Sequence, residues 1–309
     1  MSRERVFPVP WGKIAAQEWG NNQANQHWLL VHGWLDNSNS WIHLAPLLAD
    51  RGDHVIAIDL PGCGMSSWLP KGMMYHDLEI LGAIHRVVLQ LNWKRFGLIG
   101  HSLGGGLVLT YAATFPESVS HLVMLDITFV PIRPLTPYSF QPRVRKSIES
   151  FLFIENKLES GYDKVFKSKE EARDRLMKPP VYLKEHGVTE TYTVESADIL
   201  LERGLEKVDV GYRLRRDIRW VVPSLYFLDF NDQREQGKNI RCPHLIIEAS
   251  KGPKSEFAHS MYPIFRTNPE FVSHHLEGLH HIHMNQHNKV NEIILEFLNS
   301  AHQQRKAKM

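Results

Sequence analysis

A serine flanked by glycines constrains this chain more than any other feature. An apolar run that starts at Phe96 leads into Gly100-His101-Ser102-Leu103-Gly104, and a helix-like segment from Leu107 to Phe115 follows at once. This is a Gly-X-Ser-X-Gly pattern in the strand–turn–helix setting of a nucleophile elbow. Glycines suit such a turn because it is too tight for side chains and its backbone is strained. The pattern predicts that Ser102 stands at a strand end as a catalytic nucleophile.

Composition limits the classes of protein that this chain can belong to. With 309 residues, 43% of them hydrophobic and 23% charged, it can bury a sizeable core as one large domain. A formal net charge of +2 gives no reason to expect a nucleic acid as partner. Its two cysteines, Cys63 and Cys242, are too few for a disulfide framework and lack metal-ligand spacing, which fits a reducing compartment.

The ends and apolar runs of the sequence bear on its location. The charged start, Met1–Arg5, is followed by no apolar segment of the kind that a secretory signal contains. No apolar run approaches the roughly 18 residues that a membrane span needs. We therefore expect a soluble, cytoplasmic protein. The final residues, Ala307-Lys308-Met309, resemble a variant of the Ser-Lys-Leu peroxisomal address, which would make the peroxisomal import receptor a partner; an ordinary polar tail is the alternative.

Short apolar runs alternate with amphipathic segments along much of the chain, which predicts an α/β fold with a mostly parallel sheet wound on both faces. We expect strands at 28–31, 54–60, 96–100, 121–125, 243–248 and 271–276, a hairpin within 6–19, and helices at 40–48 with Ser40 as N-cap, 76–91, 107–115 and 290–298. Ligands bind outside the carboxyl ends of the strands in such sheets. His32, Ser102 and Asp126 all follow predicted strands.

The strand rhythm stops in the middle of the chain. Residues 128–236 contain helix-like, charge-rich segments and many prolines, and Ser168 with Glu171 has the spacing of a capping box. We interpret 128–236 as a helical cap inserted into a core formed by 1–127 and 237–309. A second independent domain is the alternative.

A nucleophilic serine needs a base, and a histidine oriented by a carboxylate is the expected one. Gly278-Leu279-His280 follows the last predicted strand, and the order Ser…Asp…His suits this architecture. His280 is favoured because it lies closest to the strand end. His281 and His283 remain alternatives, with a structural or surface role as their simpler interpretation.

The acid is less well defined by the sequence. The loop after the predicted strand at 243–248 reads Glu248-Ala249-Ser250-Lys251-Gly252-Pro253 and contains no aspartate. Asp126 ends the strand after the elbow helix, lies at the right edge and precedes His280, so it is favoured over Glu248. Asp36, Asp59 and Cys63 are interpreted as structural.

Acyl-group hydrolysis also needs backbone N–H donors for the developing oxyanion. Leu103, directly after the nucleophile, and Trp34, after His32-Gly33, are expected to supply them. The sequence contains no Walker motif, no dinucleotide fingerprint and no paired metal-ligand spacing, so no cofactor is expected. The run His280-His281-Ile282-His283 lacks a helical i, i+4 pair, and no metal is expected there.

Together these stretches resemble the α/β-hydrolase superfamily and, within it, the serine hydrolase-like (kraken-type) proteins. The resemblance rests on His32–Asn37, Asp59–Ser66, Gly100–Gly105 and Gly278–Met284 and covers nearly the whole chain. It implies an eight-stranded sheet with a helical cap, Ser102 as nucleophile, His280 as base and an oxyanion hole from Trp34 and Leu103. Relatives that open epoxides or remove halides carry an aspartate at the elbow, so Ser102 favours ester-type chemistry.

These features predict a serine hydrolase that cleaves a small-molecule carboxylic ester or thioester through an acyl-enzyme on Ser102. A non-catalytic small-molecule binder on the same fold is the alternative, favoured if neither Asp126 nor Glu248 reaches His280. Acyl transfer or carbon–carbon bond hydrolysis with the same residues is a further alternative, separable only by substrate.

Overall fold

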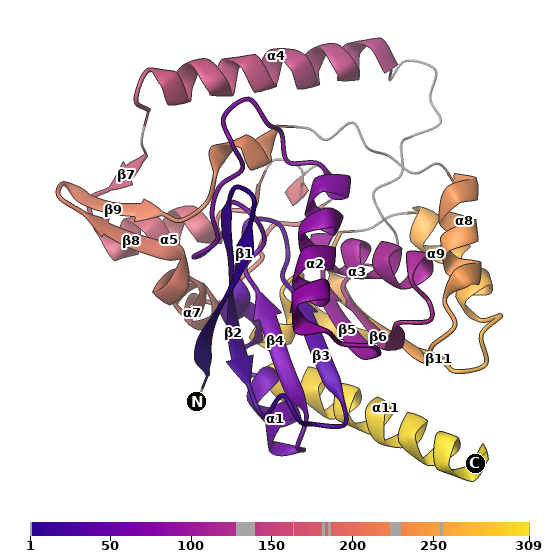
Figure 1. Cartoon of the computed structure of the whole chain (residues 1–309). Coiled ribbons are helices and arrows are strands. Elements are labelled where there is room, and N and C mark those ends of the chain that lie inside the picture. Colours follow the sequence, from indigo (N-terminus) through magenta and orange to yellow (C-terminus); the bar gives the residue numbers. More distant parts are fainter. Residues whose placement is uncertain are drawn as a thin grey trace.

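The computed structural model describes residues 2–127, 140–162, 164–180, 183–184, 187–222, 230–253 and 256–308. A central sheet with helices on both faces dominates these residues, and a helix-rich segment stands over one end of the sheet (Figure 1). Apolar runs form the strands and mostly amphipathic segments form the helices, although the helix at 103–114 is apolar and largely buried.

The central sheet has eight strands in the order β1-β2-β4-β3-β5-β6-β10-β11. Its strands are β1 (Arg3–Val9), β2 (Gly12–Trp19), β3 (His27–Val31), β4 (His54–Ile58), β5 (Phe96–His101), β6 (Val119–Leu125), β10 (His244–Lys251) and β11 (Phe271–Leu279). The pairs β1–β2 and β2–β4 are antiparallel, and every other neighbouring pair is parallel. The carboxyl ends of β3, β5, β6 and β11 therefore share one edge of the sheet.

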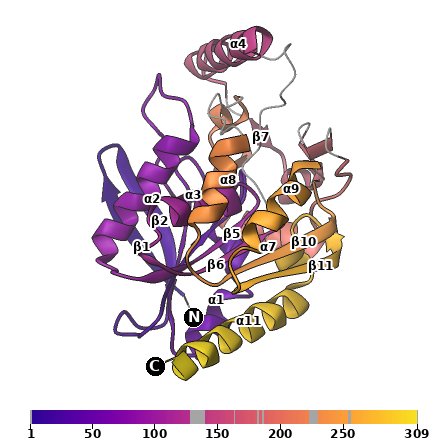
Figure 2. The ribbon, with the colours of Figure 1, turned by 90° about the vertical axis from the view of Figure 1, so that its right-hand side faces the viewer.

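Helices cover both faces of this sheet, which makes three layers (Figure 2). One face carries α2 (Asp77–Leu91), α3 (Leu103–Thr114), α8 (Phe230–Asn239) and α9 (Glu256–Phe265), and the other carries α1 (Ala45–Asp50) and α11 (His287–Lys308). Successive strand residues divide between the two cores: Leu98 packs beneath α2 and α3, whereas Ile99 packs toward α11. Burial on both faces explains the continuous apolar runs of these strands.

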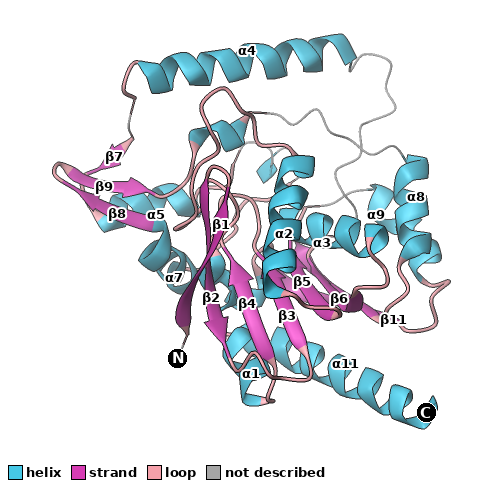
Figure 3. Ribbon diagram, viewed as in Figure 1, coloured by secondary structure: helices cyan, strands magenta, loops and turns pink. Residues whose placement is uncertain are grey.

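The segment 140–222 lies between β6 and α8 in the chain and stands beyond the carboxyl edge of the sheet (Figure 3). It consists of α4 (Phe140–Glu159), β7 (Val165–Phe166), α5 (Lys169–Met177), α7 (Val194–Gly204), β8 (Leu205–Val208), β9 (Gly211–Leu214) and the 3-10 helix η2 (Ile218–Val221). The strands form a separate antiparallel sheet in the order β7-β9-β8, which the sequence did not predict. These strands are short, and weak periodicity over so few residues is a poor signal.

Contacts tie the 140–222 segment to the central sheet. On α7, Arg203 binds Asp59 after β4 at 2.8 Å and Glu4 of β1 at 2.6 Å. The predicted cap boundary at 128 lies outside the described residues. The boundary at 236 falls within α8, where Gln236 contacts Thr110 of α3 at 3.4 Å. The division into core and cap stays a prediction.

Three predicted helices are wrong in their bounds: α3 begins at Leu103 instead of 107, α11 spans His287–Lys308 instead of 290–298, and the third is the helix predicted at 40–48. Instead of a continuous helix over 40–48 capped by Ser40, the chain forms the 3-10 helix η1 (Ser38–Trp41), capped by Asn37, and then α1. Pro46 fits the first turn of α1, where its missing N–H costs nothing, and so favours a new start there. The predicted cap of α5 is confirmed, because Ser168 Oγ accepts from the Glu171 N–H at 3.2 Å.

None of the helices in the described part of the chain combines the length and apolar character that crossing a bilayer would require.

Candidate active site

Ser102 stands at the turn between β5 and α3 in a strained conformation. Its φ is +51°, in a region that residues with a Cβ rarely adopt. Its N–H donates to the Leu125 carbonyl at 3.0 Å and fixes the turn against β6. A Cβ at Gly100 would overlap the Gly104 backbone, and one at Gly104 would overlap the Val31 carbonyl. The elbow glycines are therefore required by close backbone approach.

A continuous hydrogen-bonded chain runs from Ser102 to Asp126. His280, which follows β11, places Nε2 2.9 Å from Ser102 Oγ and Nδ1 2.5 Å from Asp126 Oδ2. A carboxylate can only accept, so His280 donates from Nδ1 and its Nε2 accepts from the serine hydroxyl. His280 is 2% exposed and Asp126 8%, which keeps bulk water from competing for these bonds.

The Asp126 carboxylate is held by its own surroundings. Asp126 has a φ of +51°. Its N–H donates to Ile247 at 2.7 Å, and Oδ1 accepts from the Ala249 N–H at 2.8 Å. A Cβ at Gly252 would overlap the carboxylate. Backbone groups of β10 and its loop thus orient the acid toward His280 from the neighbouring strand.

The alternatives that the sequence left open bind other partners. Glu248 is inside β10 and contacts His275 Nδ1 at 2.9 Å. His281 Nε2 lies 3.0 Å from Asp36 Oδ2, and His283 Nε2 lies 3.0 Å from Ser40 Oγ. Of the candidates for base and acid, the structure brings His280 and Asp126 together with Ser102.

The predicted oxyanion donors border the same cavity as Ser102. Leu103 is the first residue of α3, where a backbone N–H has no partner within the helix and carries the positive end of the helix dipole. Trp34 follows β3 in a tight turn that Leu35 closes with a φ of +63°. A Cβ at Gly33 would overlap the His101 ring, which explains the glycine before Trp34.

A second buried polar cluster lies behind the His280 loop. Asp36 accepts from Tyr192 Oη at 2.6 Å through Oδ1 and from His281 at 3.0 Å through Oδ2. His101 donates from Nε2 to the His280 carbonyl at 3.0 Å and so joins the elbow to the loop that carries the histidine. Sequence reasoning treated Asp36 as structural and did not single out Tyr192 or His101.

The protonation of this cluster follows from burial and charge. Burial by itself would raise the pKa of Asp36, but His281 and His101 outweigh it and hold that pKa well below its ordinary value. Burial lowers the pKa of His281 to about 4 and also lowers the pKa of His101. At neutral pH the cluster is therefore one carboxylate that accepts from neutral donors.

Ligand-type side chains also meet in this cluster. Among the described residues, Asp36, His101 and His281 each bring one ligand atom within 4.8 Å of the others. Both oxygens of Asp36 already accept hydrogen bonds, and His101 Nε2 is bound to a carbonyl. The rings of His280, His281 and His283 pack around His101, but their nitrogens bind different partners. We interpret the cluster as a hydrogen-bonded network.

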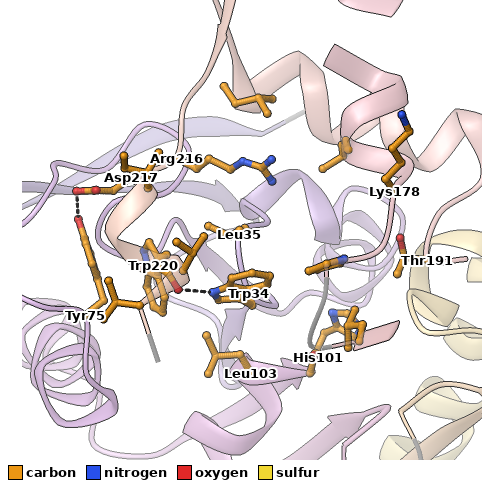
Figure 4. A pocket seen from close by; sticks show the side chains of 18 of the residues that line it. Trp34, Leu35, Tyr75, His101, Leu103, Lys178, Thr191, Arg216, Asp217 and Trp220 are labelled. Carbon is orange, nitrogen blue, oxygen red and sulfur yellow. Dashed lines mark hydrogen bonds between the residues drawn. The ribbon is translucent and has the colours of Figure 1, made fainter. Parts of the chain in front are cut away.

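A cavity of about 870 Å³ opens onto Ser102. Figure 4 shows Trp34 and Trp220 side by side at its wall, where Trp34 Nε1 donates to the Trp220 carbonyl at 3.0 Å. Tyr75 donates to Asp217 at 2.8 Å nearby. Large apolar side chains form much of the lining: Trp34, Trp68, Leu103, Leu107, Ile127, Ile154, Leu158, Phe166, Leu176, Leu183, Trp220 and Val222. Such a lining accommodates an apolar group beside the serine.

Comparison with known proteins agrees with this architecture. A family model described as "alpha/beta hydrolase fold" matches residues 27–157. A solved structure of a hypothetical protein from Pseudomonas aeruginosa PAO1 superposes with a TM-score of 0.81 at 27% identity, covering 96% of this chain and 99% of that one. A thioesterase domain from the curacin biosynthetic pathway superposes with a TM-score of 0.75 at 22% identity, covering 96% and 99% of the two chains, and shows the fold alone.

Two curated relatives extend over nearly the whole chain. The chain is 31% identical to the "Serine hydrolase-like protein" of Danio rerio, over 94% of this chain and 87% of that protein. It is 32% identical to "Serine hydrolase-like protein 2" of Homo sapiens, over 97% and 95% of the two chains. The chain belongs to the serine hydrolase-like proteins of the α/β-hydrolase fold.

Proposed function

We propose that this chain is a serine hydrolase that cleaves a carboxylic ester or thioester through an acyl-enzyme on Ser102. The chain of hydrogen bonds from Ser102 through His280 to Asp126 carries the proposal. A serine hydroxyl is a weak nucleophile until a base accepts its proton, and His280 Nε2 lies where that proton would go. The α/β-hydrolase fold and the serine hydrolase-like relatives support the same reaction class.

In the first half of the reaction, Ser102 Oγ bonds to the substrate carbonyl carbon while His280 Nε2 takes the hydroxyl proton. The N–H groups of Trp34 and Leu103 stabilise the oxyanion that forms. When the tetrahedral intermediate collapses, the bond to the leaving group breaks and His280 returns its proton to the departing alcohol or thiol. Asp126 holds the imidazole in the correct tautomer and stabilises its cation.

In the second half, a water molecule attacks the acyl-enzyme. His280 removes one water proton, the carbonyl–Oγ bond breaks, and Ser102 Oγ regains the proton as the acid leaves. The stoichiometry is one water consumed and one acid and one alcohol or thiol released. None of these steps calls on a group beyond the chain, the substrate and water.

Labelling by a fluorophosphonate probe tests the proposal, because the probe reacts with activated serines. We expect rapid labelling of the wild type and none of Ser102→Ala. Screening of short acyl esters and thioesters then identifies the better leaving group. A folded wild type that neither labels nor hydrolyses any of these substrates would contradict the hydrolase proposal and favour the alternative, a binder on the same fold.

We also keep the C-terminal address as a prediction. The helix α11 runs to Lys308, and Met309 lies outside the described residues. A fluorescent tag at the N-terminus should mark peroxisomes with the full chain and the cytoplasm after removal of Ala307-Lys308-Met309. If the full chain and the truncated chain both stay in the cytoplasm, the tripeptide is an ordinary polar tail and not a peroxisomal address.

A further inference from the structure

The cavity beside Ser102 has cationic residues as well as an apolar wall. All of these cations come from the 140–222 segment: Lys157, Lys164, Arg175, Lys178, Arg213 and Arg216. Lys157, Arg213 and Arg216 are partly buried, whereas Lys164, Arg175 and Lys178 are exposed to water. Holding a charge in a partly buried position costs free energy unless a partner compensates, and a purely apolar substrate would not supply one.

The carboxylates that line the cavity do not neutralise these cations. Asp126 binds His280, Asp217 binds Arg219 at 2.7 Å, and Glu248 binds His275 at 2.9 Å. Asp77 is the fourth, and burial, with the nearby Glu79, raises its pKa to about 6. Three of the four carboxylates are thus bound to other side chains, and Asp77 becomes neutral only as the pH falls through about 6.

Some of the cations do have partners. Arg213 binds Glu206 at 2.7 Å. Lys157 lies over the rings of Phe153 and Tyr162, and Lys164 over that of Phe166. In contrast, the side chains of Arg216, Arg175 and Lys178 make no ion pair or hydrogen bond within the described part of the chain.

Arg216 is the best placed of these unpartnered cations. Its backbone pairs with Cys63 and the adjacent Asp217 N–H donates to the Gly62 carbonyl at 2.8 Å, so the loop after β4 fixes its position. Figure 4 shows its guanidinium extending into the cavity near Leu35, away from the Asp217 side chain. Burial, and then the nearby Arg175, lowers the pKa of Arg216, while the more weakly acting Asp36 raises it; the guanidinium itself makes no ion pair with any described carboxylate.

We propose that Arg216, together with Arg175, binds an anionic group of the substrate, so that the chain acts on an acyl ester or thioester that carries a carboxylate or phosphate. A guanidinium binds either group through two parallel hydrogen bonds. The apolar wall takes the hydrocarbon part while the anion relieves the repulsion between the two arginines. This inference rests on the proposed hydrolase function and adds the class of substrate.

Three substrates test on which side of the scissile bond the anionic group of the substrate lies. The p-nitrophenyl ester of butyrate is neutral, the mono-p-nitrophenyl ester of glutarate carries a carboxylate on the acyl side, and butyryl-coenzyme A carries phosphates on the leaving group. We expect at least one anionic substrate to exceed the neutral ester in kcat/KM by about tenfold or more. The arm that shows the preference tells which side of the scissile bond faces Arg216.

Variants then test the residue. Arg216→Met should lower the ratio of anionic to neutral kcat/KM by about tenfold or more, mainly through KM, and Arg216→Lys should restore part of it. Arg215→Met is the matched control, since Arg215 is adjacent but pairs with Glu206 and does not line the cavity. An unchanged ratio in Arg216→Met, or a wild type that prefers the neutral ester to both anionic ones, would overturn the inference.

A binding measurement separates this inference from the proposed reaction. Ser102→Ala should bind mono-p-nitrophenyl glutarate in calorimetry, and the double variant with Arg216→Met should bind it about tenfold more weakly. If the wild type is inactive but this difference is found, the hydrolase proposal fails and the anion site stands. If the wild type hydrolyses esters but the difference is absent, the anion site alone fails.

Discussion

At the scale of single residues, two strained positions face each other across the site. Ser102 and Asp126 both have a φ of +51° without being glycine. Such conformations cost of the order of 1–3 kcal/mol each and persist where the surrounding structure fixes them. Here the neighbouring strands do so through the Leu125 and Ile247 carbonyls. These two conformations lower the stability of the fold, but they bring the Ser102 hydroxyl and the Asp126 carboxylate to opposite sides of the His280 imidazole.

Replacement of the acid should slow turnover without unfolding the chain. In Asp126→Asn, the side chain can turn an N–H toward His280 Nδ1, which disfavours the tautomer that accepts from Ser102. We expect kcat to fall by about 10³- to 10⁴-fold, measured on the best short ester. Glu248→Gln, a matched change on β10, should retain activity. Equal activity in Asp126→Asn and wild type would reassign the acid.

At the scale of elements, the close packing of a neighbouring side chain limits which residues a strand position can accept. A Cβ at Gly97 of β5 would overlap the Trp28 ring of β3, which is fully buried. Gly82 of α2 differs, because a Cβ there would meet the mobile end of Arg86 at 3.3 Å. The same chemical change should therefore have opposite effects in the strand and the helix.

Gly97→Ala should lower the free energy of unfolding by about 1–3 kcal/mol through overpacking. Gly82→Ala should raise it by about 0.5–1 kcal/mol, because alanine has the higher helix propensity. Urea unfolding followed by circular dichroism measures both. A Gly97→Ala variant as stable as wild type would mean that Trp28 can move aside.

A hydrogen bond from Tyr192 links the 140–222 segment to the loop after β3. Tyr192 precedes α7 and donates to Asp36. Burial, and then Asp36, raises the pKa of Tyr192 well above its ordinary value, so the hydroxyl stays a donor throughout the usual pH range. This bond and the packing of the Tyr192 ring on His281, with ring centroids 3.9 Å apart, connect the 140–222 segment to the cluster behind His280.

Tyr192→Phe should lower the free energy of unfolding by about 1–3 kcal/mol, because it removes a donor from a buried carboxylate. Tyr212→Phe is the control: Tyr212 is half-buried in β9, and its hydroxyl makes no hydrogen bond within the described residues. Urea midpoints compare the two. Equal loss in both variants would point to a general effect of removing a tyrosine hydroxyl.

At the scale of the whole molecule, buried histidines make stability depend on pH. Burial lowers the pKa of His244 and of His281 to about 4, against an ordinary value of 6.5. Between these values the unfolded chain binds more protons than the native one. Stability contributed by the neutral rings is therefore present above pH 6.5 and is lost as the pH falls toward 4.

Each such histidine contributes up to about 1.4 kcal/mol per pH unit to the slope in that window. We expect the urea midpoint to fall steeply from pH 6.5 to pH 4. His244→Gln should flatten the slope, whereas His275→Gln should not, since His275 on β11 has a side chain that is 65% exposed. A midpoint that stays constant across the window would show that these rings are protonated in the native state.

The sequence by itself determined the layered fold and the edge at which the site lies. Strands buried on both faces have continuous apolar runs, so strands such as Phe96–His101 and His244–Lys251 can be recognised from the sequence. Because parallel strands end at the same edge of a sheet, the sequence also predicts the edge at which the site lies. It also determined that Ser102 stands at a turn between a strand and a helix, because a glycine-flanked turn is a local feature. The first residues of helices were harder to predict, because capping depends on a few atoms. The helix predicted at 40–48 is an example, since the chain forms η1 there and starts a new helix near Pro46.

Only the tertiary structure decided which side chains meet at that edge. Position after the strand favoured His280 but left His281 and His283 open, because the partners Asp126, Asp36 and Ser40 lie more than a hundred residues away in the chain. The choice between Asp126 and Glu248 depends on where two neighbouring strands end relative to each other. Arg216 carries no motif, and it stands out only in the folded chain, where its side chain is partly buried at the cavity wall and makes no ion pair with the described residues. Local sequence sets periodicity and turns, whereas the partners of buried polar groups are set by contacts distant in the chain.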